Sequence, residues 1–115
     1  TARQFGALDR QMAAAGLPID RSGPIITDAP IWVPYVGGGT GLALPVEPPA
    51  SVLDLAHHLH STVVVVMSSE NPFPALVQAG GPASECFESV DIGRPTDPAL
   101  AHVLDGARVY RLVCP

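Results

Sequence analysis

Short apolar runs bounded by turn residues recur along this chain of 115 residues and predict the strands of one buried sheet. The run Val63-Val64-Val65-Val66 is apolar and β-branched at every position. Such a run is typical of a central strand that helices cover on both faces. The strands are predicted over residues 24–27, 41–44, 62–67, 86–92 and 108–114.

Apolar residues at helical spacing predict helices between these strands. A first helix is expected before residue 16, where Gly16 ends it. Ser51 is predicted to cap the second helix, with Asp54 completing a capping box, and Asp97 is predicted to cap the last one. The helices are expected over residues 2–15, 51–59, 74–79 and 97–104, and the stretch 28–36 fits either a short helix or an extended arm.

The alternation of strands and helices predicts the α/β class. The expected architecture is a three-layer α/β/α sandwich, Rossmann-like, with a mostly parallel sheet of about five strands. Residues 1–115 are expected to form a single α/β domain, because a chain of this length supports one core. The chain starts at Thr1 without an initiator Met, so we expect it to be excised from a larger protein.

Composition narrows the classes of function. The net charge is -5, and the six basic residues, all Arg, are scattered along the chain, which argues against a nucleic-acid partner. Apolar residues make up 47% and charged residues 15%, which predicts a fairly apolar surface for a soluble domain. No apolar run is long enough to span a bilayer, which takes about 18 residues.

Two motifs that often carry chemistry do not qualify here. The glycine-rich run 37–41 opens a strand and has no neighbouring Lys, whereas a phosphate-binding loop opens a helix, so a structural turn is the better interpretation. His57, His58 and His60 gather at a helix end, where positive charge is favoured. Only His57 and His60 share one helix face, and no third metal ligand is evident beside that pair. No catalytic residue, metal site or cofactor is therefore expected in this domain.

A possible ligand or docking surface follows from sheet geometry. In open parallel sheets, ligands bind outside the carboxyl ends of the strands, where the strand order reverses. If the first strand lies between the second and third, two polar loops meet there. An aromatic pair at that place suits stacking on a sugar or packing on a neighbouring domain, and Trp32 also fits ordinary core packing. The candidate residues are Asp28, Trp32, Tyr35, Ser68, Glu70 and Asn71.

Cys86 and Cys114 are the two cysteines of the chain. Cys86 opens one predicted strand and Cys114 closes another. If these strands are antiparallel neighbours, the two cysteines lie opposite one another and a disulfide is possible. If the strands are parallel, the cysteines are roughly 20 Å apart and no bridge forms. Both arrangements agree with the sequence.

A series of short motifs runs from the first predicted strand to the third. It resembles the soluble C-terminal region of membrane-embedded glycosyltransferases of the protein mannosyltransferase and aminoarabinose transferase type. About a third of the chain is covered. The matching residues are Ile26, Thr27, Asp28, Pro30 and Trp32, then Tyr35 and Gly38, then Ala43-Leu44-Pro45, Leu53-Asp54-Leu55-Ala56 and the run Val63 to Val66.

The resemblance implies a non-catalytic domain on the extracytoplasmic face of the cell membrane. Such enzymes transfer sugar from a polyprenyl-phosphate donor, and their acidic catalytic residues lie between membrane helices outside this chain. The implied partners are the membrane-embedded part of the same polypeptide and a lipid-linked sugar or acceptor. Two alternatives stay open: a free-standing module that binds a small ligand near Asp28 and Ser68, and a structural or oligomerisation domain that uses residues 31–36.

Overall fold

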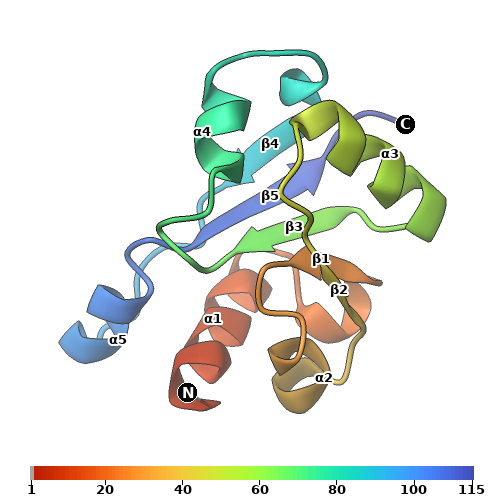
Figure 1. The fold of residues 1–115 in the computed structure, drawn as a ribbon. Coiled ribbons are helices and arrows are strands. Elements are labelled where there is room, and N and C mark those ends of the chain that lie inside the picture. The colour runs from red at the N-terminus through yellow and green to blue at the C-terminus, as the bar shows by residue number, and fades with distance from the viewer. Residues whose placement is uncertain (1) are drawn as a thin grey trace.

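The computed structural model describes residues 2–115, without the side chains at positions 2, 36, 37 and 103. Five strands form one sheet between helices that pack on both of its faces (Figure 1). The helices are α1 (Ala2–Ala14), α2 (Trp32–Gly37), α3 (Pro49–Leu59), α4 (Phe73–Gln78) and α5 (Pro98–Val103), with 3-10 turns at Ile19–Arg21 and Ser84–Cys86. The strands are β1 (Ile25–Thr27), β2 (Gly41–Ala43), β3 (Val63–Val66), β4 (Phe87–Val90) and β5 (Arg108–Leu112).

The sheet is mixed, so the predicted mostly parallel, Rossmann-like sandwich is wrong. The strand order is β2-β1-β3-β5-β4. β1 runs parallel to β2 and to β3, whereas β5 runs antiparallel to both of its neighbours, β3 and β4. The molecule is therefore a small mixed α/β domain.

The position of α5 explains this error. When a helix crosses over the face of a sheet between two strands, it brings the chain back to the end of the sheet where the first strand began, and the next strand then runs parallel to the first. Here α5 projects beyond the end of the sheet and packs beside α1 (Figure 1). The chain consequently re-enters the sheet at the end where β4 left it, and β5 runs in the opposite direction. A helical pattern in the sequence predicts that helix but not its place.

β3 lies at the centre of the sheet, as its apolar sequence predicts. Val63 and Val65 belong to the core beneath α1 and α2, and Val64 and Val66 belong to the core beneath α3 and α4. All four side chains are at most 1% exposed. Because helices cover both faces of the sheet at β3, every residue of this strand is apolar.

The helix starts agree only in part with the caps predicted from sequence. Asp97 does cap α5, since its Oδ1 accepts a hydrogen bond from the backbone N–H of Ala99 at 2.9 Å. The Ser51–Asp54 capping box is wrong, because α3 already begins at Pro49. Proline is favoured in the first turn of a helix, where its missing N–H leaves no hydrogen bond unmade.

The first residue of β2 packs tightly against the segment that leads into α2. A β carbon at Gly41 would lie 2.1 Å from the carbonyl oxygen of Pro30. Because the obstacle is backbone, it cannot turn aside as a flexible side chain can. This close approach explains a glycine at the start of a strand, where glycine is otherwise unfavourable.

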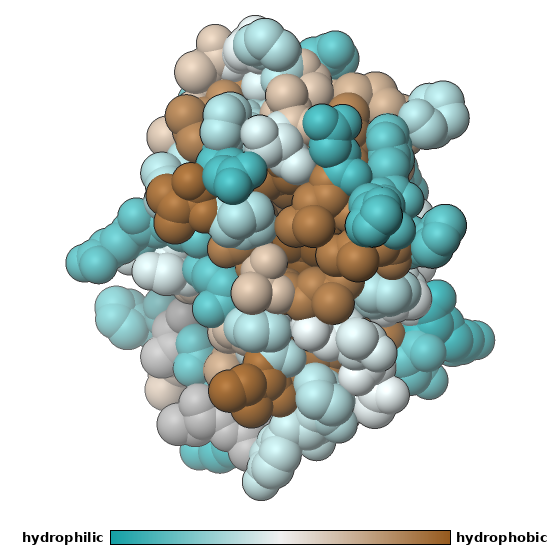
Figure 2. Space-filling model, turned by 45° about the vertical axis from the view of Figure 1, so that its right-hand side comes forward, coloured by the Kyte–Doolittle hydropathy of each residue, from teal (hydrophilic) through white to brown (hydrophobic). Residues whose placement is uncertain are grey.

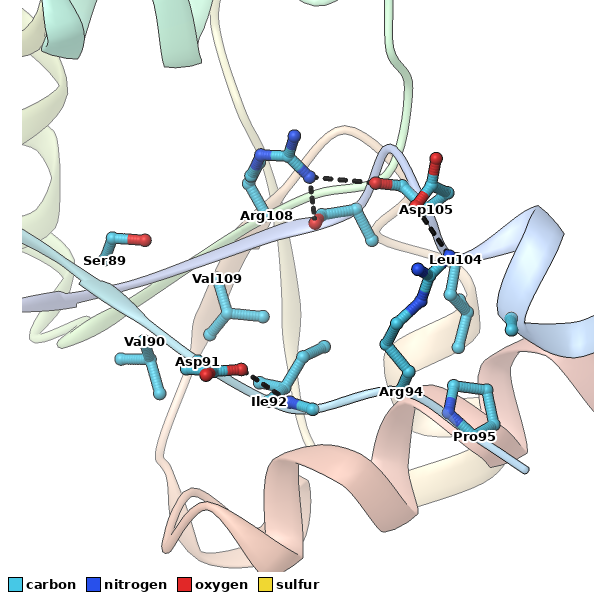
Figure 3. A pocket seen from close by; sticks show the side chains of 13 residues that line it. Ser89, Val90, Asp91, Ile92, Arg94, Pro95, Leu104, Asp105, Arg108 and Val109 are labelled. Atoms are coloured by element: carbon cyan, nitrogen blue, oxygen red, sulfur yellow. Dashed lines mark hydrogen bonds and ion pairs between the residues drawn. The ribbon is translucent and has the colours of Figure 1, made fainter.

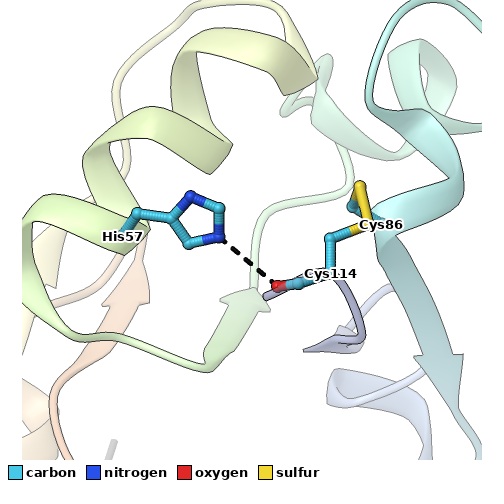
Figure 4. Close-up of a disulfide and its surroundings, with 3 residues drawn as sticks. All are labelled: His57, Cys86 and Cys114. Atoms are coloured by element: carbon cyan, nitrogen blue, oxygen red, sulfur yellow. Dashed lines mark hydrogen bonds between the residues drawn. A yellow bond between two sulfur atoms is a disulfide. The ribbon is translucent and has the colours of Figure 1, made fainter.

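β4 and β5 are antiparallel neighbours, and the structure joins Cys86 and Cys114 by a disulfide with a Cα–Cα distance of 5.0 Å (Figure 4). His57 of α3 points toward the same place, and its Nε2 lies 3.4 Å from the carbonyl oxygen of Cys114. The bridge therefore ties the end of β5 to the turn before β4, next to α3.

No helix in the described part of the chain is long and apolar enough to cross a membrane.

Candidate functional site

Asp28 lies just after β1 and fastens the loop that follows β3. Its Oδ1 accepts a hydrogen bond from the backbone N–H of Met67 at 2.8 Å. Its Oδ2 accepts one from the backbone N–H of Ser68 at 3.0 Å and one from the side-chain amide of Asn71 at 3.3 Å. The structure thus brings together Asp28, Ser68 and Asn71 at the carboxyl ends of two adjacent parallel strands.

These polar side chains are occupied with one another. Ser68 Oγ accepts a hydrogen bond from the backbone N–H of Glu70 at 3.2 Å, and Asn71 Oδ1 accepts one from the backbone N–H of Phe73 at 2.9 Å. An ionised carboxylate has about four acceptor positions, and Asp28 already uses three of them. The network therefore stabilises the loop after β3. It also borders an open hollow of about 490 Å³, which the exposed Glu70 lines as well.

Trp32 stands apart from this network, in the first turn of α2. Its side chain is 3% exposed and stacks on Phe5 of α1, with ring centroids 5.2 Å apart and an interplanar angle of 9°. Trp32 therefore joins α1 to α2 within the core. Its indole Nε1 is buried and has no hydrogen-bond partner among the described residues.

Ile31 and Tyr35 flank Trp32 in sequence but face solvent, with exposed fractions of 85% and 77%. They border a hollow of about 520 Å³ whose exposed lining is mainly apolar. Asp28 is the one charged residue on that lining, and it is shared with the neighbouring hollow. The lining residues are Phe5, Asp28, Ala29, Pro30, Ile31, Trp32 and Tyr35.

The low share of charged residues is visible on the molecular surface. On the face drawn in Figure 2, apolar side chains gather in a central patch that polar side chains border. Solitary apolar residues are normal on protein surfaces, whereas gathered ones indicate contact with another molecule. The patch in Figure 2 lies at mid-height, whereas α2 lies at the lower end of the molecule (Figure 1). We use the term apolar face only for the surface at α2 that the hollow defines, formed by Ile31, Tyr35 and the space between them and Phe5.

A smaller hollow, of about 220 Å³, lies between the segment after β4 and the turn after α5 (Figure 3). Arg94 points across it to Asp105, with Nη2 2.9 Å from Oδ1. Arg108 donates through Nη1 to the backbone oxygens of Asp105 and Ala107 at 3.0 and 2.9 Å. Asp91 and Asp105 balance the charge of the two arginines, so the hollow offers no net charge to an ionic ligand.

Other features that carry chemistry are sparse. No group of three or more His, Cys, Asp or Glu side chains in the described residues could hold a metal ion. His60 ends α3 in a left-handed conformation, with φ 58°, and lines a further hollow together with His57. Burial raises the pKa of Tyr110 above its usual value of about 10, and the nearby Arg108 lowers it in part. Tyr110 lies in the core beneath α4, where its ring meets Phe73 edge-on with ring centroids 5.5 Å apart.

Sequence reasoning did not connect Phe5 with the candidate surface. Helical spacing correctly marks Phe5 as a packing residue, but nothing local indicates that its partner is Trp32, 27 positions later. The hollow beside Arg94 and Arg108 was also missed, because it depends on how the segment after β4 packs against the turn after α5. A pairing of aromatic residues across two helices has no signature in a single sequence.

Together the fold and the site define a small mixed α/β domain with a disulfide and an apolar face. Comparisons with protein-family models, with curated proteins and with solved structures gave no match. Its function must therefore follow from the residues described above.

Proposed function

We propose that this chain is a non-catalytic docking domain, the extracytoplasmic C-terminal part of a membrane glycosyltransferase that uses a polyprenyl-phosphate sugar. Its apolar face packs against the membrane-embedded part of the same polypeptide. The observation that carries this proposal is the exposure of Ile31 (85%) and Tyr35 (77%) beside an apolar hollow. Exposed apolar surface of this kind is characteristic of a contact with another protein segment.

The position of the apolar face agrees with this partner. Phe5, in the second turn of α1, forms one wall of the hollow. In the proposed parent protein, the segment that leaves the membrane leads into α1. The membrane-embedded part then lies close to the apolar face, and docking requires no long linker.

The disulfide also supports the proposed location. Disulfides persist in oxidising compartments and are rare in the cytosol. The Cys86–Cys114 bridge therefore fits a domain on the extracytoplasmic side. The rival function, a small-ligand module centred on Asp28, has less support, since three hydrogen bonds within the domain already occupy that carboxylate.

The gene that encodes this chain gives the first test. The proposal requires several membrane-spanning helices upstream of Thr1, each with about 20 apolar residues. An initiator Met directly before Thr1, with no such helices, would refute it.

Photo-crosslinking gives the second test. A photoreactive phenylalanine analogue replaces Tyr35 in the full-length protein in its native membrane, and the crosslinked peptides are identified by mass spectrometry. The matched control places the same analogue at Val46, which is 81% exposed and does not line the hollow of the apolar face. We expect Tyr35 to crosslink to the membrane-embedded part and Val46 to give none or much less. Equal crosslinking from both positions, or none from Tyr35, contradicts the proposal.

A further inference from the structure

The hollow of the apolar face and the hollow beside the loop after β3 share two lining residues, Asp28 and Ala29. Both hollows therefore border the carboxyl end of β1. Their volumes, about 520 and 490 Å³, fall within the usual range for ligand sites, roughly 300–1,000 Å³. An occupant that reaches from one hollow to the other passes over Asp28.

The charge on the two linings is entirely negative. Asp28 and Glu70 are the charged residues there, and none of the six arginines lines either hollow. Asp28 is half-buried and Glu70 is exposed, and neither forms an ion pair with a described residue. The charge that balances these carboxylates on docking is therefore expected from the partner.

An occupant that is only apolar would leave this negative charge unbalanced. Three of about four acceptor positions of the Asp28 carboxylate are used within the domain, so one remains. A segment that covers Asp28 takes it out of water, and a carboxylate that loses water without a new partner is costly. The exposed Ile31, Tyr35 and Val46 meanwhile offer contacts to apolar groups. A suitable occupant thus combines a positive charge with apolar groups.

The single remaining position on Asp28 favours an ammonium group over a guanidinium. The planar fork of an arginine binds two neighbouring acceptor positions at once. The ammonium of a lysine is a compact charge with three donors, which can be divided between Asp28 and Glu70. Its long alkyl stem suits an apolar surface. This chain contains no lysine, so a second copy of it cannot supply the group.

We propose that the apolar face docks a polypeptide segment that carries a lysine between apolar residues. The lysine ammonium binds at Asp28 and Glu70, and the apolar neighbours of the lysine occupy the hollow beside Ile31 and Tyr35. The docking of a segment here rests on the proposed function, which assigns it to the membrane-embedded part. The inference adds the chemistry by which that segment is recognised.

The first test measures how three small probes with the same phenylbutyl group bind. They are 4-phenylbutylamine, which is cationic, 4-phenylbutan-1-ol, which is neutral, and 4-phenylbutanoate, which is anionic. Binding is followed by the NMR signals of the Met67 and Ser68 amides, which donate to Asp28. We expect the amine to bind about tenfold more tightly than the alcohol, and the anion to bind more weakly than either. The advantage of the amine should shrink as salt rises from about 0.01 M to about 1 M, because salt screens exposed charges.

Two matched variants identify the group responsible. Glu70→Gln keeps the size of an exposed side chain and removes its charge, so the fold should stay intact. It should lower the affinity for the amine about threefold and leave the affinity for the alcohol unchanged. Glu85→Gln removes the charge of an exposed glutamate that lines neither hollow, and it should change neither affinity.

The second test looks for the lysine in the full-length protein in its native membrane. A carbodiimide joins carboxylates to amines that lie against them, and mass spectrometry identifies the linked peptides. We expect Glu70 to be linked to a lysine with apolar neighbours in the membrane-embedded part. Glu85 serves as the control and should give no such link, because it lies outside both hollows.

Several results would overturn the inference. Equal affinity for the amine and the alcohol, or an advantage of the amine that Glu70→Gln leaves unchanged, shows that the carboxylates do not recognise a cation. Amide signals that respond to phosphatidylcholine vesicles but not to the amine assign the face to a lipid surface. Signals that change with protein concentration alone assign it to a second copy of the chain. A Tyr35 crosslink to the membrane-embedded part, without a lysine linked to Glu70, rejects this inference and leaves the proposed function standing.

Discussion

Removing the disulfide is expected to cost the domain a large part of its stability. The bridge joins residues separated by 28 positions in sequence. Closing a loop of that length in the unfolded chain corresponds to about 3.6 kcal/mol at 25 °C in the chain-entropy description. The folded ladder does not depend on it, since Phe87 stays paired with Leu112 and the N–H of Val113 donates to the carbonyl oxygen of Cys86 at 2.9 Å. The loss should therefore come mainly from the unfolded state.

The assay is urea and thermal unfolding of the double variant Cys86→Ala and Cys114→Ala, followed by circular dichroism. For a domain of this size, the expected loss corresponds to a fall in Tm of about 15 °C. Wild-type protein in a strong reductant is the control, and it should show a similar fall. A loss below about 1 kcal/mol would refute the reasoning, because the bridge would then hardly restrict the unfolded chain. Thiols that react in denatured protein without reductant would show that the bridge does not form.

Three further predictions concern the interior and the loops. Asp28→Asn should lower the free energy of unfolding by about 1–3 kcal/mol, since an amide cannot accept from both backbone N–H groups that the carboxylate holds; an unchanged urea midpoint would contradict this. Gly41→Ala should lower the free energy of unfolding by about 1–3 kcal/mol, because the added β carbon clashes with the backbone of Pro30. The control Gly81→Ala has open space around it and should be neutral or slightly stabilising in the same thermal assay. The pKa of Tyr110 is raised in the folded state, so its contribution to the free energy of unfolding is fully present below about pH 10 and is lost as the pH rises through the higher pKa of the folded state. Urea unfolding should therefore show a fall in stability in that pH range, and Tyr110→Phe should reduce this fall. An equal fall in the variant would exclude Tyr110 as the cause.

Local patterns predicted the elements of this fold well. The apolar run Val63 to Val66 identified the central strand, and Asp97 identified the start of α5. The arrangement of the later strands could not be predicted in the same way. The direction of β5 depends on where α5 packs, which is a tertiary contact with α1. Neither helix carries a local signal for that contact.

The candidate site was predictable to a similar extent. The rule that ligands bind at the carboxyl ends of parallel strands brought Asp28, Ser68 and Asn71 together, and the structure places them in one hydrogen-bonded group. The sequence did not show that these groups satisfy each other and are therefore less available to a ligand. It also did not show that Trp32 is buried while Tyr35 faces solvent, because both belong to one short apolar stretch.

The place of β5 in the sheet affects the order in which the domain can assemble. β4 pairs with β5 alone, and β5 in turn pairs with β3. Until residues 108–112 leave the ribosome, β4 has no strand to pair with and one edge of β3 is open. Domains usually fold as units during synthesis, so most of this one must wait for its last strand. The disulfide cannot form before Cys114 is synthesised, and a nascent chain stalled before residue 108 should expose the open edge of β3 and an unpaired β4 to chaperones.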